Sequence, residues 1–101
     1  MPHVTTFKFK AISGERQAVI DSFRRWQQER LPKVNGFIRS VLASSLDDAD
    51  EFMVTVLFDS TESYNANSSD AEQGAWFQEL RSHLVADPEW FNGNVELLTT
   101  A

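Results

Sequence analysis

The segment FMVTVLF, residues 52–58, runs directly into DSTESY, residues 59–64, and this stretch decides the fold. β-Branched and aromatic side chains make residues 52–58 the most strand-like run in the chain. Successive side chains of a strand point to opposite faces. Asp59, followed three residues later by Glu62, has the form of a helix capping box, so a central strand is predicted to pass directly into a helix. One face of this strand is fully apolar and carries Phe52, Val54, Val56 and Phe58, and the nearly apolar opposite face carries Met53, Thr55 and Leu57.

Because both faces of the strand are apolar, both sides of the sheet need to be covered. The two helices that a chain of this length provides cover only one side. A second copy of the chain would cover the other side, in keeping with the closed symmetry of most homo-oligomers. We therefore predict a homodimer that packs face to face, and the sequence leaves open which face of the sheet forms the interface.

The remaining elements follow from hydrophobic periodicity and from residues that end helices or make turns. Apolar side chains at helical spacing predict a helix over 15–31, which Pro32 ends. A short helix is expected near Ser60, and a longer one runs from a capping box at Ser69 to about Val85. An acidic turn joins two of the strands as a hairpin. Strands are predicted over 4–12, 37–46, 52–58 and, after an Asn92-Gly93 turn, 90–99.

The order strand, helix, strand, strand, helix, strand is the split βαβ, or ferredoxin-like, arrangement. We therefore predict a single α+β domain over residues 1–101, built on a four-stranded antiparallel sheet. A chain of this length supports one hydrophobic core.

Composition excludes several classes of function. Nine Lys and Arg against fifteen Asp and Glu give a net charge of −6, which argues against nucleic-acid binding. The absence of cysteine excludes disulfides and thiolate nucleophiles. No apolar run approaches the roughly 18 residues of a membrane helix, and no signal-peptide pattern is present. We therefore expect a cytoplasmic protein without a membrane partner.

His83 is the better chemical candidate of the two histidines, since His3 lies in a terminus that we expect to be frayed. His83 follows Trp76 and Leu80 at helical spacing and should share their environment. One reading is a partly buried helix histidine that is hydrogen-bonded to a neighbour. The other is a general acid/base, or a group that orients a ligand in a pocket.

A small apolar pocket is expected between the sheet and the helices, where side chains of several elements converge. Its aromatic walls would suit a planar ligand. Arg39, on the same strand face as Phe37 and Val41, is either part of an interface ion pair or a contact for an anionic substrate. The acidic turn lacks the spacing of a calcium loop, and no glycine-rich phosphate loop exists, so we expect no metal. The candidate substrate-binding residues are Phe23, Trp26, Arg39, Trp76, Phe77 and Leu80.

Three segments carry a resemblance to a known family: PKVNGF at 32–37, FDSTESY at 58–64, and residues 76–84 followed by PEW at 88–90. In these segments the chain resembles the antibiotic-biosynthesis monooxygenase family of the dimeric α+β-barrel superfamily. The resemblance covers essentially the whole chain, and it implies a ferredoxin-like domain that pairs into a dimeric α+β barrel. Oxygenating members of the family act on aromatic polyketides or quinols without metal or flavin, and relatives degrade heme.

The heme-degrading relatives bind iron through a histidine on the second helix, with an asparagine on the first strand and a tryptophan on the third. His83 matches that histidine. The first strand of this chain has no asparagine and the third has no tryptophan. We therefore expect no heme and no other cofactor.

The resemblance implies cofactor-independent oxygenation of a small, planar, electron-rich aromatic compound. The pocket would exclude water and orient a phenol or quinol, and His83 would accept its proton. The resulting anion would react directly with dioxygen. Because a fold does not by itself define an activity, an alternative stays open: a non-enzymatic dimeric ligand-binding or stress-associated module.

Overall fold

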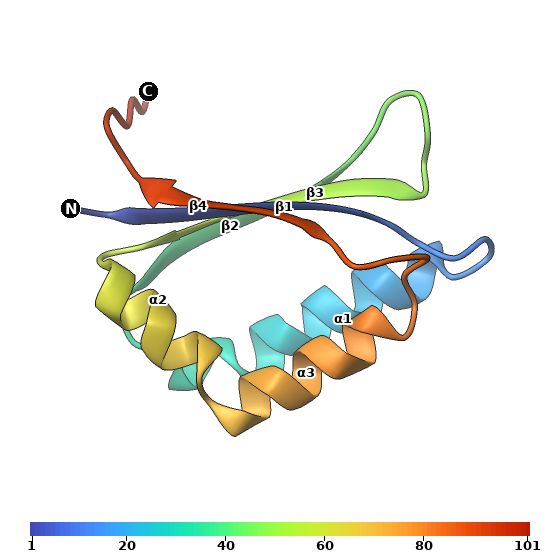
Figure 1. Ribbon diagram of the computed structural model, residues 1–101, viewed down its shortest axis with the longest axis horizontal. Coiled ribbons are helices and arrows are strands. Elements are labelled where there is room, and N and C mark those ends of the chain that lie inside the picture. The colour runs from blue at the N-terminus through green and yellow to red at the C-terminus, as the bar shows by residue number, and fades with distance from the viewer.

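The computed structural model describes all residues, 1–101, and its four strands form one antiparallel sheet in the order β2-β3-β1-β4. This topology confirms the predicted ferredoxin-like arrangement. Three helices lie together on one face of the sheet, and no helix lies on the other (Figure 1). None of these helices is both long and apolar enough to span a membrane. The elements are β1 (His3–Lys10), α1 (Arg16–Glu29), a 3₁₀ turn (Leu31–Lys33), β2 (Phe37–Ser44), β3 (Glu51–Phe58), α2 (Thr61–Ser68), α3 (Ala71–Arg81) and β4 (Glu89–Asn94).

The core lies between the helices and the two central strands. β1 and β3 pair along their whole lengths, which sets Phe7 opposite Val54 and Phe9 opposite Phe52 on the face toward the helices. From the helix side, Val19 of α1 and Leu80 of α3 pack into this layer, and both are fully buried. The predicted apolar face of residues 52–58 is thus the inner face of the sheet.

Helix α2 begins where the sequence predicts a helix, but its capping residue is different. Ser60, not Asp59, is the N-cap, and its hydroxyl accepts a hydrogen bond from the Ser63 amide at 3.1 Å. Asp70, not Ser69, caps α3 by accepting from the Glu72 amide at 2.8 Å. In both cases a neighbouring side chain with equal capping ability holds the extended conformation that an N-cap requires.

The last strand also departs from the prediction. Asn92 and Gly93 do not form a turn, because they pair with Thr5 and Val4 of β1. β4 then ends at Asn94 rather than near residue 99. Pairing with a complete neighbouring strand has overridden the local turn preference of the Asn-Gly dipeptide.

The outer face of the sheet is apolar and uncovered in a single chain. Met53, Val41 and Phe91 lie on it, and their exposed fractions are 45%, 56% and 64%. Leu57, on the same face, is already buried within the chain. The face predicted to meet a second copy is therefore present, and the dimer itself stays a prediction.

Candidate functional site

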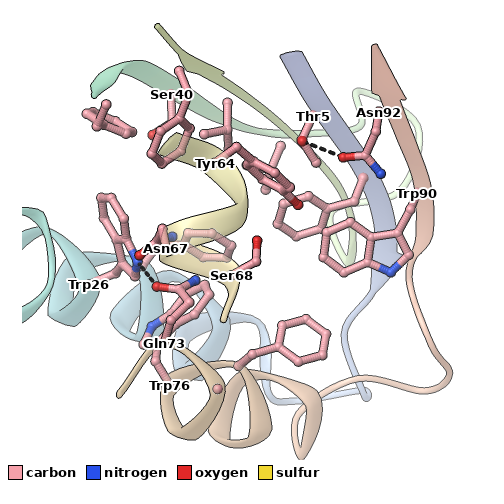
Figure 2. A pocket seen from close by; sticks show the side chains of 18 residues that line it. Thr5, Trp26, Ser40, Tyr64, Asn67, Ser68, Gln73, Trp76, Trp90 and Asn92 are labelled. Atoms are coloured by element: carbon pink, nitrogen blue, oxygen red, sulfur yellow. Dashed lines mark hydrogen bonds between the residues drawn. The ribbon is translucent and has the colours of Figure 1, made fainter. Parts of the chain in front are cut away.

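A cavity of about 410 Å³ lies between the inner face of the sheet and the helices. Residues of all four strands and all three helices contribute to its lining (Figure 2). Its volume is in the range of small-molecule sites. In Figure 1 the helices diverge from the sheet toward the end where α2 joins α3, and residues near this junction line the cavity.

Aromatic residues make up half of the cavity lining. The Trp90 ring stacks on Phe7 with a centroid distance of 4.5 Å, and the Trp76 ring meets Phe23 edge-on at 5.2 Å. On the far side, Trp26 packs against Phe37 at 5.3 Å. Rigid aromatic walls of this kind favour a flat, apolar ligand.

One end of the cavity is polar. The Thr5 hydroxyl donates to Asn92 Oδ1 at 2.6 Å, and both side chains line the cavity. Behind Thr5 lies His3, whose Nε2 is 2.8 Å from Thr5 Oγ1 and whose Nδ1 is 3.0 Å from Thr61 Oγ1. The His3 ring stacks on Tyr64 at 4.3 Å, and Tyr64 also lines the cavity. A polar chain therefore leads from a buried histidine to the cavity surface.

The expectation of a frayed terminus at His3 is wrong. His3 is only 4% exposed and is the first residue of β1, paired with Phe58 of β3. The signal was available in the sequence. His3 continues the alternation of Thr5, Phe7 and Phe9, so the strand begins one residue earlier than predicted and its inward face includes His3.

A second polar group closes the opposite edge of the cavity. The Trp26 indole N–H donates to Gln73 Oε1 at 2.8 Å. Arg30, which is 6% exposed, donates to Asn67 Oδ1 at 2.8 Å and pairs with Glu72 at 3.1 Å. These contacts fix the end of α1 to the junction of α2 and α3, so they hold the helices at the spacing that leaves the cavity open.

The structure brings together four of the predicted binding residues. Phe23, Trp26, Trp76 and Phe77 all line the cavity. Leu80 does not, because it is fully buried in the core beneath α3. The prediction that the pocket lies between sheet and helices agrees with this geometry, although Leu80 supports the wall rather than forming it.

Arg39 lies on the wrong side of the sheet for the cavity. A β-bulge between Phe37 and Arg39 breaks the alternation of β2, so Phe37 pairs with Phe58 whereas Arg39 pairs with Leu57. Arg39 therefore shares the outer face with Val41, and the expectation that it shares a face with Phe37 is wrong. A bulge of this kind leaves no clear trace in a run of mixed residues.

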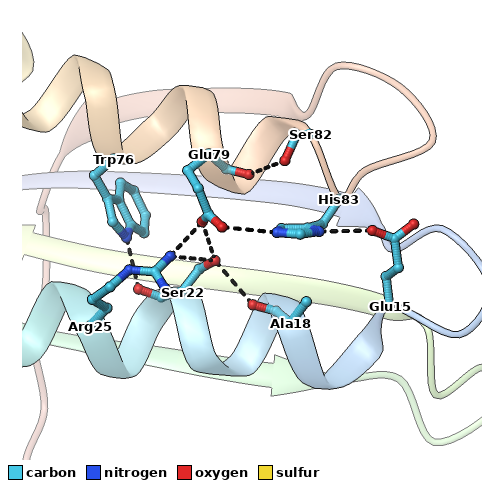
Figure 3. A network of polar contacts seen from close by, with 8 residues as sticks. All are labelled: Glu15, Ala18, Ser22, Arg25, Trp76, Glu79, Ser82 and His83. Atoms are coloured by element: carbon cyan, nitrogen blue, oxygen red, sulfur yellow. Dashed lines mark hydrogen bonds and ion pairs between the residues drawn. The ribbon is translucent and has the colours of Figure 1, made fainter.

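His83 does not line the cavity, and its predicted place beside Trp76 and Leu80 is wrong. Helix α3 ends at Arg81, so helical spacing no longer applies two residues later. The ring instead lies between two carboxylates, with Nδ1 2.8 Å from Glu15 and Nε2 3.0 Å from Glu79 (Figure 3). This arrangement corresponds to the first of the two interpretations of the sequence, a partly buried histidine that is hydrogen-bonded to its neighbours.

The two carboxylates govern the ionisation of His83. Two hydrogen bonds raise the pKa of His83: the one to Glu15 has the larger effect and the one to Glu79 the next largest. Burial acts in the opposite direction, and its effect is smaller. Partial burial works against ionisation of Glu79, but bonds from His83 and Ser22 and the charge of Arg25 outweigh it, and the pKa of Glu79 is lowered. The network thus favours a charged imidazolium that links α1 to α3 outside the cavity.

Comparison with known proteins identifies the family. Residues 2–79 match the family described as antibiotic biosynthesis monooxygenase. The chain belongs to this family. A search of curated proteins finds no match to this sequence.

Several solved structures share the fold of this antibiotic biosynthesis monooxygenase family member. A point mutant of SnoaB, a cofactor-independent oxygenase from Streptomyces nogalater, superposes with a TM-score of 0.84 at 12% identity, over 96% of this chain and 95% of that one. A Chloroflexus aurantiacus protein assigned to the same family gives 0.79 at 23% identity, over 100% and 98%. A conserved protein from Methanosarcina mazei gives 0.83 at 14% identity, over 92% and 91%. Because the sequence identities are this low, the similarity shows that these proteins share a fold and nothing more.

The sequence of this antibiotic biosynthesis monooxygenase family member did not reveal its polar cavity residues. Thr5 and Asn92 come from strands that are far apart in the chain and pair only in the folded sheet. Asn67 and Gln73 lie on the two sides of the junction between α2 and α3. No local pattern marks such residues, because their proximity depends on tertiary structure.

Proposed function

We propose that this protein is a cofactor-independent monooxygenase that oxygenates a small, planar hydroxyaromatic compound in the cavity between sheet and helices. The observation that carries this proposal is an aromatic cavity with a polar end formed by Thr5 and Asn92. A purely structural module would have no need of such a cavity. Membership of the antibiotic biosynthesis monooxygenase family and the fold of SnoaB support the same activity.

The substrate itself supplies the electrons in this reaction. Loss of the hydroxyl proton leaves an electron-rich anion, and the ring carbon of highest electron density bonds to dioxygen. Protonation gives a hydroperoxide, and cleavage of its O–O bond with loss of the carbon-bound hydrogen releases water. The product carries a new carbonyl, as in conversion of a phenol to a quinone. One oxygen atom stays in the product and the other leaves as water.

The protein contributes position and environment. The stacked walls at Trp90 and Phe7 hold a flat ring, and the polar end fixes the direction of its hydroxyl. Removal of water protects the anion and the hydroperoxide from side reactions. Holding the reacting groups in place supplies much of the rate enhancement in reactions of this kind.

His83 is no longer our candidate for the proton acceptor. Its two nitrogens are occupied by Glu15 and Glu79, and it lies away from the cavity. The acceptor in this proposal is instead a group at the polar end of the cavity.

The proposal includes a homodimer formed through the outer face of the sheet. The exposed side chains of Met53, Val41 and Phe91 support it, since large apolar faces on a sheet are normally covered. Stacking the two sheets would leave each cavity on the outside of the pair, within its own subunit.

Oxygen uptake with a panel of anthrones and dihydroxynaphthalenes tests the proposed function, with ¹⁸O₂ to trace one labelled atom into the product. We expect turnover by the wild type that Trp90→Leu reduces by about tenfold or more, through loss of orientation. Phe91→Leu is the matched control, because Phe91 neighbours Trp90 on β4 but lies on the outer face. Absence of turnover across the panel would contradict the proposal and favour the ligand-binding module.

A further inference from the structure

A buried histidine lies directly behind the polar end of the cavity. His3 is 4% exposed, and both ring nitrogens are hydrogen-bonded, to Thr5 at 2.8 Å and to Thr61 at 3.0 Å. Neither partner is charged. His83 differs in this respect, since two carboxylates hold its ring.

We propose that Thr5 and His3 form a proton relay, in which Thr5 receives the hydroxyl proton of a bound phenol and passes its own proton to His3. The proposal rests on the proposed function, because it identifies where the substrate proton goes. It also defines the substrate class more narrowly: the compound must carry an acidic aromatic hydroxyl that reaches Thr5 when the ring lies between the aromatic walls.

The hydrogen bonds that link Asn92, Thr5 and His3 can be arranged in two ways, which differ in which group donates and which accepts. A neutral imidazole carries one N–H, and the Thr5 hydroxyl has one proton to donate. When Thr5 donates to Asn92 Oδ1, it accepts from His3 Nε2–H. When the Asn92 amide turns over and donates to Thr5, the Thr5 hydroxyl donates to His3 Nε2, and His3 Nδ1–H donates to Thr61. The relay starts from this second arrangement, because Thr5 already donates its hydroxyl proton toward His3 Nε2.

The transfer conserves atoms and charge. The O–H bond of the phenol breaks as a new O–H bond forms on Thr5, and the original Thr5 O–H bond breaks as Nε2–H forms on His3. The products are a phenolate in the cavity and an imidazolium behind it. The Thr5 hydroxyl then donates to the phenolate oxygen, and the two imidazolium N–H groups donate to Thr5 and Thr61. The proton returns by the same path when the hydroperoxide forms.

The surroundings of His3 suit a transient cation. The ring of Tyr64 stacks on the imidazole with an interplanar angle of 19° and offers its π-face to the positive charge. Tyr64 is the titratable side chain packed against the ring. The facing positions of the neighbouring strands are Phe58 and Asn94, which are uncharged. Imidazole is the side chain that takes up a proton near neutral pH.

The first test follows the ionisation of 4-nitrophenol in the cavity, because the phenolate absorbs visible light and no turnover is required. We expect the bound probe to ionise at a lower pH in the wild type than in Thr5→Val or His3→Gln. At a fixed pH near the midpoint, the ratio of phenolate to phenol should be about tenfold lower in each variant, equivalent to a shift of about one pKa unit of the probe. Thr5→Ser keeps the hydroxyl and should restore the wild-type curve.

Two controls separate the relay from a loss of structure. Thr6→Val makes the same chemical change on the outer face of β1 and should leave the probe curve unchanged. Thr61→Val removes the other hydrogen-bond partner of His3 without changing the cavity lining, so it should shift the probe curve in the same direction as His3→Gln. This variant keeps the relay testable if His3→Gln folds poorly. Identical curves for wild type, Thr5→Val and Thr61→Val would overturn the relay, as would failure of the wild type to bind the probe.

Turnover distinguishes failure of the relay from failure of the proposed function. With an oxygenated substrate, Thr5→Val should lower kcat by about a hundredfold and change KM far less, as expected for a lost proton acceptor. Unchanged turnover in Thr5→Val refutes the relay and leaves the oxygenase intact. A shifted probe curve with no oxygen uptake by the wild type keeps the relay and refutes the oxygenase.

Discussion

Two glycines with nearly the same backbone conformation provide a sharp test of the packing at the start of α2. Gly14 and Gly36 both have positive φ, at 86° and 81°. A Cβ added at Gly14 would meet no atom within 4 Å. A Cβ at Gly36 would lie 2.5 Å from Asp59 Oδ1 and 2.6 Å from Ser63 Cβ. A comparison of alanine substitutions at the two positions therefore separates the cost of backbone strain, which both share, from the cost of steric overlap, which occurs only at Gly36.

The expected destabilisation follows from these two contributions. Gly14→Ala should cost about 1 kcal/mol of unfolding free energy, because an L-residue is strained in this region while the unfolded chain loses some entropy. Gly36→Ala carries the same strain and adds about 1–3 kcal/mol of overpacking against the start of α2. The sum for Gly36→Ala is about 2–4 kcal/mol.

Thermal unfolding followed by far-ultraviolet circular dichroism measures the difference, at one protein concentration throughout. For a domain of this size each kcal/mol lowers Tm by about 4–8 °C, so Gly14→Ala should lose about 4–8 °C and Gly36→Ala at least twice as much. An equal loss in both variants would refute the reasoning, because it would mean that the overlap at Asp59 and Ser63 carries no cost. Gly36→Ala should also disturb the cavity, since α2 carries Tyr64 one residue beyond Ser63.

Three further predictions concern the dimer, the outer network and heme. Met53→Asp places a charge on the exposed apolar face and should convert a dimer into a monomer in analytical sedimentation at micromolar concentration, and a wild type that already sediments as a monomer would exclude the dimer. Because the pKa of His83 is raised on folding, its contribution to stability is complete below the unfolded value of about 6.5 and disappears as pH rises through the higher folded value. His83→Gln should therefore lower stability by up to about 1 kcal/mol in mildly acidic urea titrations and have little effect in alkaline ones, and a pH-independent effect would exclude the ion pairs as its source. Added hemin should give no stoichiometric Soret shift, whereas a tight one-to-one shift lost in His83→Ala would make the protein a heme binder.

Strand and helix positions were predictable because they depend on local patterns. The alternation of residues 52–58 appears in the sequence and recurs in the structure as β3, and the polar run after it recurs as the start of α2, although Ser60 rather than Asp59 is the N-cap. The hairpin between β2 and β3 follows from the same local signals. The order of elements then left few alternatives for the fold.

The errors arose where one residue changes the geometry of its neighbours. The bulge before Arg39 moves that side chain to the other face of the sheet, and the end of α3 at Arg81 removes His83 from the helical stripe. His3 and Asn92 gained their roles from pairing with strands distant in the chain. Such effects depend on the assembled sheet, so a local pattern does not contain them.

The aromatic wall also has an optical consequence. The chain contains three tryptophans, Trp26, Trp76 and Trp90, and all three line the cavity. The intrinsic fluorescence of the protein therefore comes entirely from rings that a bound ligand would touch. A hydroxyaromatic that enters should shift this emission, and a quinone product, which accepts excited electrons readily, should quench it. Binding and product release can thus be followed in the unlabelled protein. Phe91→Leu should leave the fluorescence change intact, whereas Trp90→Leu should alter it.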